Sequence, residues 1–281
     1  MSNKCAEGDY MIGAIIGDIV GSKYEYSNFK SKDFKWFDEG TRFTDDTIMT
    51  IAVAKALLDS KPDYSDLSEK AIYWMQYFGR KYPSDYGVNF ITWLHEENPK
   101  PYNSYGNGAA MRVSAAGWFA NSIEQAVDLA KKVTAVSHNH PEGIRGAVAV
   151  STIIFLCRKG ASKGEIKEFV TKKLKYNLDF TLDQIRPKYK FDESCQGTVP
   201  VAIVAFLEST NFIDCIQNAI SVGGDADTLT AIAGSIAEAY YLFPGINEQI
   251  VKKAESYLPK DLLDILYEFR KTDRINRSYL I

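Results

Sequence analysis

The chain has 281 residues, of which 46% are hydrophobic and 25% are charged, and its formal net charge is -3. These values are typical of a globular protein with a sizeable core, and the length fits one large domain or two small ones. A charge this close to neutral gives no electrostatic reason to expect long nucleic acid or an anionic membrane as a partner.

The chain begins with polar residues 1–10, followed by a short apolar run over residues 11–20 that contains Asp18. This run is neither a signal peptide nor a membrane span, so we expect a cytoplasmic protein. The segment from Gly17 to Glu25 mixes small residues with two acids, and small residues permit close helix packing. Glu25 is the more interesting acid, because it follows the apolar run and precedes an acidic cluster.

Helical periodicity dominates the rest of the chain. Apolar residues recur at positions i, i+3, i+4 and i+7 in most segments, many of which are rich in alanine. The pattern predicts helices over residues 48–58, 67–80, 109–120, 123–136, 144–157, 166–174, 199–207, 228–241 and 262–269. No ladder of alternating strands is visible. The least regular stretch, residues 175–194, reads as an excursion or a lid. We therefore predict an all-α fold with a single compact multi-helix domain spanning residues 1–281, with its core at about 11–270.

The sequence contains four cysteines, at positions 5, 157, 195 and 215. None forms a CxxC pair or has the spacing of metal ligands. Three of them fall in apolar stretches, where a free cysteine behaves as a small hydrophobe. We therefore expect reduced thiols in the core.

A first acidic cluster, Thr44, Asp45 and Asp46, lies directly before a predicted helix. Its simplest interpretation is an N-cap, because Thr and Asp bond the free N–H groups of a first helical turn. A second cluster, Asp225, Asp227 and Thr228, also precedes an apolar helix. Capping explains one of its aspartates but not two carboxylates after a Gly-Gly pair, which lets the backbone approach another group closely.

Together the two clusters offer four carboxylates and at least two threonine hydroxyls. If the two helix starts face each other, the carboxylates repel one another and hard cations would relieve that repulsion. Carboxylate and hydroxyl oxygens suit Mg²⁺, Mn²⁺ or Ca²⁺, whereas Zn²⁺ favours Cys and His. The residue types alone leave a two-metal site and two independent caps as equal alternatives.

Two further segments carry polar groups suited to binding. Ser104, Tyr105, Gly106 and Asn107 form a Gly-rich loop before a predicted helix, a sequence that can present N–H groups to a phosphate, although an ordinary turn is the simpler interpretation. His138 and His140 are spaced i, i+2 and do not share a helix face. Each is equally consistent with a substrate-binding histidine and with a helix cap.

Five motifs in this order, GDIVGSKYE, FTDDT, SYGNGAAMR, SHNHPEG and GGDADT, resemble the ADP-ribosylglycohydrolase family. They lie between residue 13 and about residue 241. The resemblance implies an all-α fold with a cleft holding two divalent cations, Mg²⁺ or Mn²⁺. The metal ligands it implies are Thr44, Asp45, Asp46, Asp225, Asp227 and Thr228.

The resemblance also implies roles for residues around the metals. Glu25 matches the acid of the family's Gly-Ser-x-Tyr-Glu motif, a candidate catalytic or gating residue. The loop of Ser104, Tyr105, Gly106 and Asn107 matches the segment that holds the diphosphate and adenosine, and His138 matches a substrate-binding histidine. His140 with Pro141 is closer to the bacterial pattern, whereas the SYGNG loop is closer to the serine-linkage branch, so the acceptor stays open.

We therefore expect a metal-dependent hydrolase that cleaves the bond at ribose C1″ of an ADP-ribosyl group. It would release ADP-ribose from a modified protein or small molecule, through a transition state resembling an oxocarbenium ion. The expected catalytic residues are Glu25, Asp45, Asp46 and Asp227. The alternatives are a two-metal phosphoesterase or nucleotide pyrophosphatase, and a silent module that only binds ADP-ribose.

Overall fold

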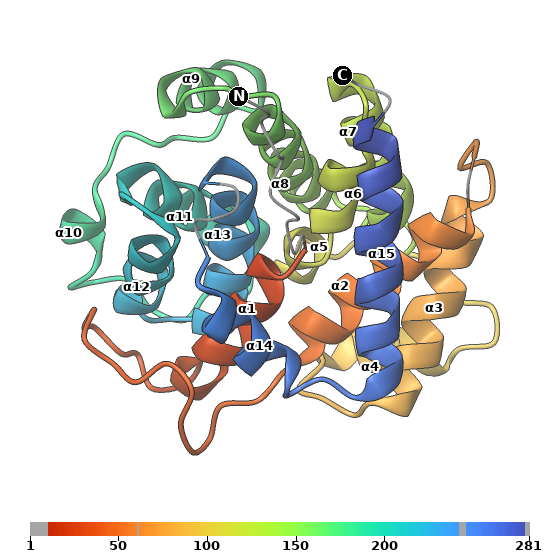
Figure 1. Ribbon diagram of the computed structural model, residues 1–281, viewed down its shortest axis with the longest axis horizontal. Coiled ribbons are helices and arrows are strands. Elements are labelled where there is room, and N and C mark those ends of the chain that lie inside the picture. Colours follow the sequence, from red (N-terminus) through yellow and green to blue (C-terminus); the bar gives the residue numbers. More distant parts are fainter. Residues whose placement is uncertain (1–10, 61, 242–245, 279–281) are drawn as a thin grey trace.

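The computed structural model describes residues 11–60, 62–241 and 246–278, and these residues fold into helices joined by short connections (Figure 1). In this part of the chain the only β-type pairing is an isolated bridge between Gly106 and Ser194. The all-α fold predicted from the sequence is therefore confirmed. The helices are α1 (Gly13–Gly21), the 3-10 helix η1 (Ser22–Tyr24), α2 (Asp45–Asp59), α3 (Leu67–Lys81), α4 (Val88–His95), α5 (Gly108–Met111), α6 (Ser114–Phe119), α7 (Ile123–Thr134), α8 (Pro141–Arg158), α9 (Lys163–Lys173), α10 (Leu182–Ile185), α11 (Cys195–Glu208), α12 (Phe212–Val222), α13 (Ala226–Tyr241), α14 (Glu248–Glu255) and α15 (Lys260–Ser278).

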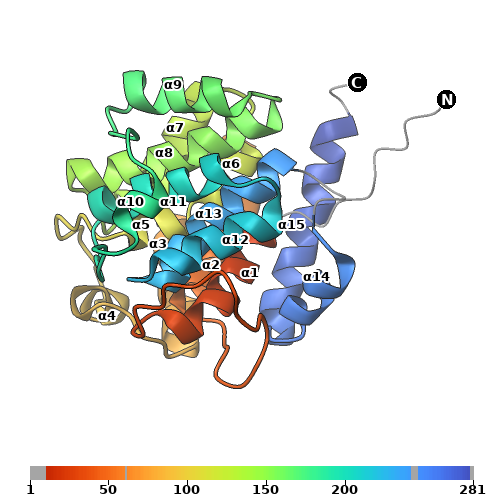
Figure 2. The same cartoon turned by 90° about the vertical axis from the view of Figure 1, so that its left-hand side faces the viewer.

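Helix α13 forms the centre of the molecule. It packs against α1, α8, α11 and α12, and it lies among them in both Figure 1 and Figure 2. Every residue from 226 to 239 is buried, although this stretch contains Asp227, Thr228 and Glu238. A helix that is buried all round belongs to the core of a domain, so the polar residues at its start are enclosed by protein.

Helix α1 lies against α13 at backbone contact. Gly13, Gly17 and Gly21 recur every four residues along α1 and face α13. A Cβ atom on Gly21 would lie 2.6 Å from the Cα atom of Asp227, and one on Gly17 would overlap the carbonyl oxygen of Thr230. The close helix packing expected for this segment is therefore present, and it requires residues without side chains.

The predicted helices agree with the structure over most of the chain, with ends that differ by a few residues except in α15, which continues from the predicted end at residue 269 to Ser278. One prediction was wrong, because residues 109–120 are not a single helix. They form α5 and α6, separated at Arg112 and Val113, whose φ and ψ angles are −91° and −1° and −94° and 4°. These angles lie in the region of a turn, and the Arg112 side chain at the break contacts Ser137 and Phe90.

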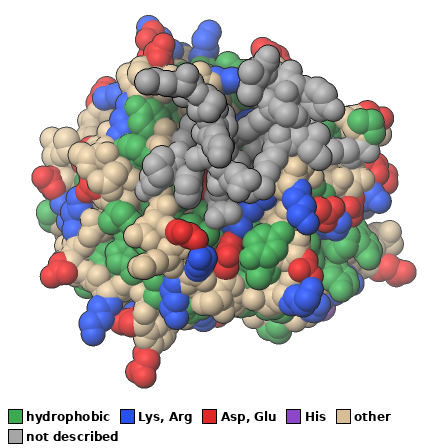
Figure 3. All heavy atoms as spheres, in the orientation of Figure 1, with side chains coloured by type: hydrophobic (Ala, Val, Ile, Leu, Met, Phe, Trp, Pro, Cys, Tyr) green, Lys and Arg blue, Asp and Glu red, His purple; other side chains and the backbone are tan. Residues whose placement is uncertain are grey.

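Cys157, Cys195 and Cys215 are free and buried, as expected, whereas Cys5 lies outside the described residues. No helix in the described ranges is long and apolar enough to cross a membrane. On the face shown in Figure 3, acidic and basic side chains are interspersed.

Candidate active site

The start of α2 is organised by a carboxylate from another helix. Thr44 is the N-cap of α2, and its hydroxyl oxygen accepts a hydrogen bond from the N–H of Asp46 at 3.3 Å. Asp18 of α1 accepts from the Thr44 hydroxyl at 2.6 Å and from the N–H groups of Thr44 and Thr47 at 2.9 and 3.1 Å. The capping interpretation of this cluster is thus correct, and Asp18 adds a buried anion at the positive end of the helix.

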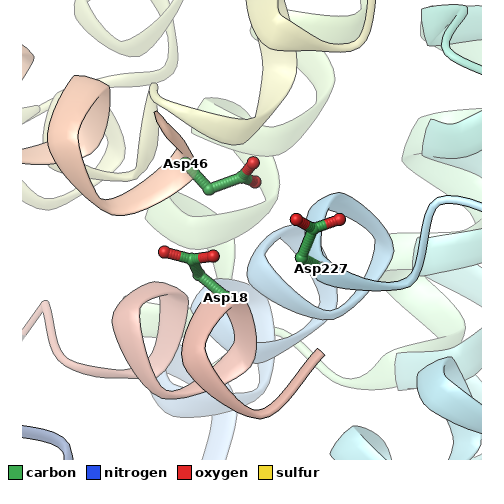
Figure 4. Close-up of side chains that lie close together, drawn as sticks. All are labelled: Asp18, Asp46 and Asp227. Atoms are coloured by element: carbon green, nitrogen blue, oxygen red, sulfur yellow. The ribbon is translucent and has the colours of Figure 1, made fainter. Parts of the chain in front are cut away.

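Asp18 is a residue that the sequence prediction did not include among the site acids. It is fully buried within an apolar helix. Its carboxylate points toward those of Asp46 and Asp227, which come from α2 and α13 (Figure 4). An aspartate inside an otherwise apolar run is a signal of buried polar function, because burying a carboxylate without partners is costly.

The start of α13 depends on two glycines in left-handed conformations. Gly223 and Gly224 have φ angles of 70° and 77°, which disfavour residues with a side chain. This turn leads directly into Asp225, whose carboxylate accepts a hydrogen bond from Asn107 Nδ2 at 2.6 Å. The carboxylate of Asp227 accepts from the N–H of Thr228 at 3.0 Å. The Gly-Gly pair therefore brings both acids to one turn of the chain.

The acids form two adjacent sets that share one member. Carboxylate oxygens of Asp18, Asp46 and Asp227 lie within 4.8 Å of one another, and so do those of Glu25, Asp225 and Asp227. Asp227 belongs to both sets, so it lies between them. The two acidic clusters predicted from the sequence do meet, in an arrangement that offers two neighbouring positions for cations.

Burial makes these acids difficult to ionise. Burial raises the pKa of Asp18, Asp46, Asp225 and Asp227 above the ordinary value of an aspartate. It also raises the pKa of Asp45 to about 7, with smaller contributions from neighbouring carboxylates. Negative groups that repel one another in a buried cluster favour either protonation or a bound cation.

The donor set fits a hard divalent cation. Every residue in the two sets contributes carboxylate oxygen, with no thiolate or imidazole among them. Oδ1 of Asp46 is buried without a hydrogen-bond partner, while its Oδ2 accepts from the Thr228 hydroxyl at 3.2 Å. An unpartnered buried carboxylate oxygen beside other acids is what a cation site requires.

A cavity of about 400 Å³ opens above these acids, within the range of small-molecule sites. Most of the residues predicted for the site line it: Glu25, Asp45, Asp46, Ser104, Gly106, Asn107, His138, Asp225, Asp227 and Thr228. Two predicted residues do not. Thr44 caps α2, and Tyr105, half exposed, lines an adjoining hollow.

Glu25 follows directly after η1. Together with Asp45, Asp46, Asp225 and Asp227 it lines one part of the cavity, which we call the acid wall. Its side chain is largely buried, and burial raises its pKa to about 7, against a hydrogen bond from Tyr26 that lowers it. The ring of Tyr26 is exposed and stacks on Phe191 with the ring centroids 5.6 Å apart. Phe191 belongs to the irregular stretch 175–194, so this excursion supplies part of the cavity mouth.

The Gly-rich loop is held from both sides. The N–H of Gly106 donates to Ser104 Oγ at 3.1 Å, and the N–H of Asn107 donates to the carbonyl of Glu193 at 2.6 Å. These two N–H groups are therefore engaged within the protein and are not free to bind a phosphate. The following helix α5 is only one turn long, so the loop does not lead into the long helix that the sequence predicted.

The two histidines have different roles. His138 is buried and lines the cavity beside Tyr102, with their ring centroids 5.6 Å apart. His140 is the N-cap of α8, where its Nδ1 accepts a hydrogen bond from the N–H of Glu142 at 3.1 Å. The structure thus separates the alternatives that the sequence left equal, since only His138 faces the cavity.

The sequence model of a family described as ADP-ribosylglycohydrolase matches residues 9–275. This chain belongs to the ADP-ribosylglycohydrolase family. It is therefore a member of a family of enzymes, and the resemblance seen in the sequence motifs is confirmed. A solved structure described as an ADP-ribosylglycohydrolase-related protein complex has the same fold, with a TM-score of 0.69, 19% identity and coverage of 95% of this chain and 97% of that one.

Several characterised relatives match along most of their length. ADP-ribosylhydrolase ARH3 of Homo sapiens is 26% identical over 333 residues, covering 90% of each chain. ADP-ribosyl-[dinitrogen reductase] glycohydrolase of Rhodospirillum rubrum is 26% identical, covering 82% of this chain and 83% of its own. ADP-ribosylarginine hydrolase Tri1 of Pseudomonas putida is 24% identical, covering 86% of this chain and 72% of its own.

Proposed function

We propose that this ADP-ribosylglycohydrolase cleaves the bond at ribose C1″ of an ADP-ribosyl group and releases ADP-ribose from a modified protein or small molecule. The observation that carries the proposal is the pair of carboxylate sets sharing Asp227 at one wall of a substrate-sized cavity. Relatives named for ADP-ribosyl hydrolysis support the same reaction.

We propose that the acid wall holds two divalent cations, Mg²⁺ or Mn²⁺, with Asp227 between them. The ligands would come from Thr44, Asp45, Asp46, Asp225, Asp227 and Thr228. Such cations, when bound, polarise oxygen atoms and make hydroxide available near neutral pH. Asp18 would add its carboxylate to one of these sets, and its hydrogen bonds to Thr44 and Thr47 hold the start of α2 in place.

The residues of the chain then supply proton transfer and orientation. The Glu25 carboxylate, whose pKa burial raises to about 7, can exchange a proton near neutral pH, while Asp45 would act as a deprotonated ligand beside it. Asp46 and Asp227 would stabilise the positive charge that develops on the ribose in an oxocarbenium-like transition state. The loop of Ser104, Tyr105, Gly106 and Asn107, with His138, would bind the rest of the substrate and so fix C1″ against the acid wall.

Residues at the cavity mouth would select the acceptor. Tyr26, Asp85 and Phe191 line the opening, and Val88 beside them is strongly exposed. Relatives act on acceptors that their names describe differently, including arginine and dinitrogen reductase. The acceptor is therefore best determined by a direct comparison of linkages.

The test is a metal-supplemented hydrolysis panel over arginine-, serine- and O-acetyl-linked ADP-ribose, with products separated by chromatography. We expect free ADP-ribose from at least one linkage. We expect Asp227→Asn to reduce turnover about 10³-fold, since it removes the shared carboxylate. Glu168→Gln, a matched change in an exposed ion pair with Lys172, should leave turnover unchanged.

Two results would contradict the proposal. Release of AMP would assign the site to the phosphoesterase or pyrophosphatase class. Tight ADP-ribose binding in calorimetry, with no hydrolysis of any linkage, would indicate a silent binding module.

A further inference from the structure

The lining of the cavity contains a buried arginine that forms no ion pair in the described part of the chain. Arg112 is 1% exposed and lines the cavity. Its Nη2 donates to Ser137 Oγ at 2.8 Å, its guanidinium lies over the ring of Phe90, and its Nε has no hydrogen-bond partner. Among the described residues no carboxylate contacts it. Since buried charges are normally paired, this arginine requires an explanation.

The contacts of Arg112 restrict where His138 carries its proton. An arginine can only donate hydrogen bonds, so Ser137 Oγ is the acceptor of its bond from Nη2. Ser137 Oγ also lies 2.9 Å from His138 Nδ1, and Nη2 itself lies 3.4 Å from that nitrogen. A hydroxyl oxygen can accept two hydrogen bonds, but among the described residues Nδ1 is the only other partner of the Ser137 hydroxyl, so the hydroxyl hydrogen is directed at Nδ1. Both neighbours therefore donate to Nδ1, which must be the unprotonated nitrogen of a neutral ring.

The other ring nitrogen of His138 faces the substrate loop. A Cβ atom placed on Gly106 or on Gly108 would lie 3.5 Å from Nε2. Within the described part of the chain, Nε2 makes no hydrogen bond, and His138 lines the open cavity. Burial, and to a lesser extent the charge of Arg112, lower the pKa of His138, so the ring stays neutral. A single N–H is thus directed at the space above the loop.

We propose that Arg112 is a positioning residue that acts through Ser137 to hold His138 as the neutral Nε2–H tautomer. His138 then presents a hydrogen-bond donor to an acceptor oxygen of the bound ligand, a phosphate or ribose oxygen of ADP-ribose. The identity of that ligand rests on the proposed function, whereas the tautomer does not. The positive charge of Arg112, which has no carboxylate in contact within the described structure, favours an anionic oxygen at the same place.

The direct test is nitrogen NMR of the protein labelled with ¹⁵N-histidine, without ligand. The chain has only three histidines, and the His138→Gln variant assigns the signal. We expect Nε2 protonated and Nδ1 unprotonated from pH 6 to pH 8. Arg112→Lys, which keeps a donor, should preserve this pattern, whereas Arg112→Met should yield a mixture of tautomers. An Nδ1-protonated or doubly protonated His138 in the unmutated protein would overturn the inference.

A double-mutant cycle tests whether Arg112 acts through His138. We expect Arg112→Met to weaken ADP-ribose binding about tenfold, the loss typical of a hydrogen bond to a charged ligand, and by less than about twofold when His138 is already alanine. An equal loss in both backgrounds would overturn the positioning role. If no ADP-ribosyl linkage is hydrolysed but the tautomer is found, the proposed function fails and this inference stands.

Discussion

The two walls of the cavity differ in charge and in construction. The acid wall gathers buried carboxylates, with Asp227 shared between two sets, whereas a second wall, formed by Ser104, Gly106, Asn107, Arg112 and His138, carries a guanidinium that forms no ion pair in the described structure. Each wall is electrostatically incomplete by itself. Buried groups of opposite charge lining one cavity suit a ligand that completes both walls, with cations on one side and anionic oxygens on the other.

The walls are also held together in different ways. The acid wall stands on the starts of α2 and α13. Helix α1 touches the backbone of α13 through Gly17 and Gly21, and its Asp18 accepts hydrogen bonds from the start of α2. The second wall includes a loop held by individual hydrogen bonds, such as that from Asn107 N to Glu193 O. Packed backbones resist small changes more strongly than single hydrogen bonds do, and the following variants probe this difference.

The largest effect is expected from filling the contact between α1 and α13. In Gly17→Ala the new Cβ would overlap the carbonyl oxygen of Thr230, so the helices must separate. We expect the free energy of unfolding to fall by about 1–3 kcal/mol, measured by denaturant titration. Gly164→Ala in α9, where the nearest atom is 3.9 Å away, should instead stabilise by about 0.5–1 kcal/mol. Equal effects would show that α1 and α13 tolerate separation.

A smaller effect is expected from cutting the link between the walls. Asn107 Nδ2 donates to Asp225 Oδ2 at 2.6 Å and to Thr198 Oγ1 at 3.0 Å. Asn107→Ala removes both bonds, and we expect kcat/KM to fall about tenfold, as for other residues that orient metal ligands. Asn121→Ala, an exposed asparagine, serves as the control. Unchanged kcat/KM would mean that the loop does not orient Asp225.

The smallest effect is a pH dependence confined to the acid wall. The raised pKa values of Asp45 and Glu25, about 7, mean that the folded metal-free protein binds more protons than the unfolded chain. The contribution of these two carboxyl groups to the free energy of unfolding is therefore present at pH values below their pKa in the unfolded chain. It is lost as the pH rises through about 7, their pKa in the folded protein. Metal ligands must be deprotonated, so added Mg²⁺ should stabilise more at pH 8 than at pH 5.5, by about 1 kcal/mol.

Thermal unfolding with and without Mg²⁺ measures this difference. Asp46→Asn should weaken the stabilisation by Mg²⁺ at both pH values, because it removes a carboxylate from one set. A stabilisation that is the same at pH 5.5 and pH 8 would contradict the assignment of the cations to these acids.

Much of the molecule follows from local sequence. Apolar periodicity placed most helices, and turn and cap residues placed the two acidic clusters at helix starts, because these features depend on neighbours within a few residues. The break at Arg112 could not be found in this way. Residues 109–120 are helical in pattern, and the contacts that Arg112 makes at the break are with Ser137 and His138, more than twenty residues away in the chain.

The sequence by itself determined the helical class, the family motifs and the two groups of acids. Only the tertiary structure decided that these groups share Asp227, that Asp18 joins them from α1, and that His138 rather than His140 faces the cavity. The physical reason is that the shared site arises from contacts between residues far apart in the chain. The backbone contact of α1 with α13 sets those contacts, and no local pattern encodes the distance between two carboxylates.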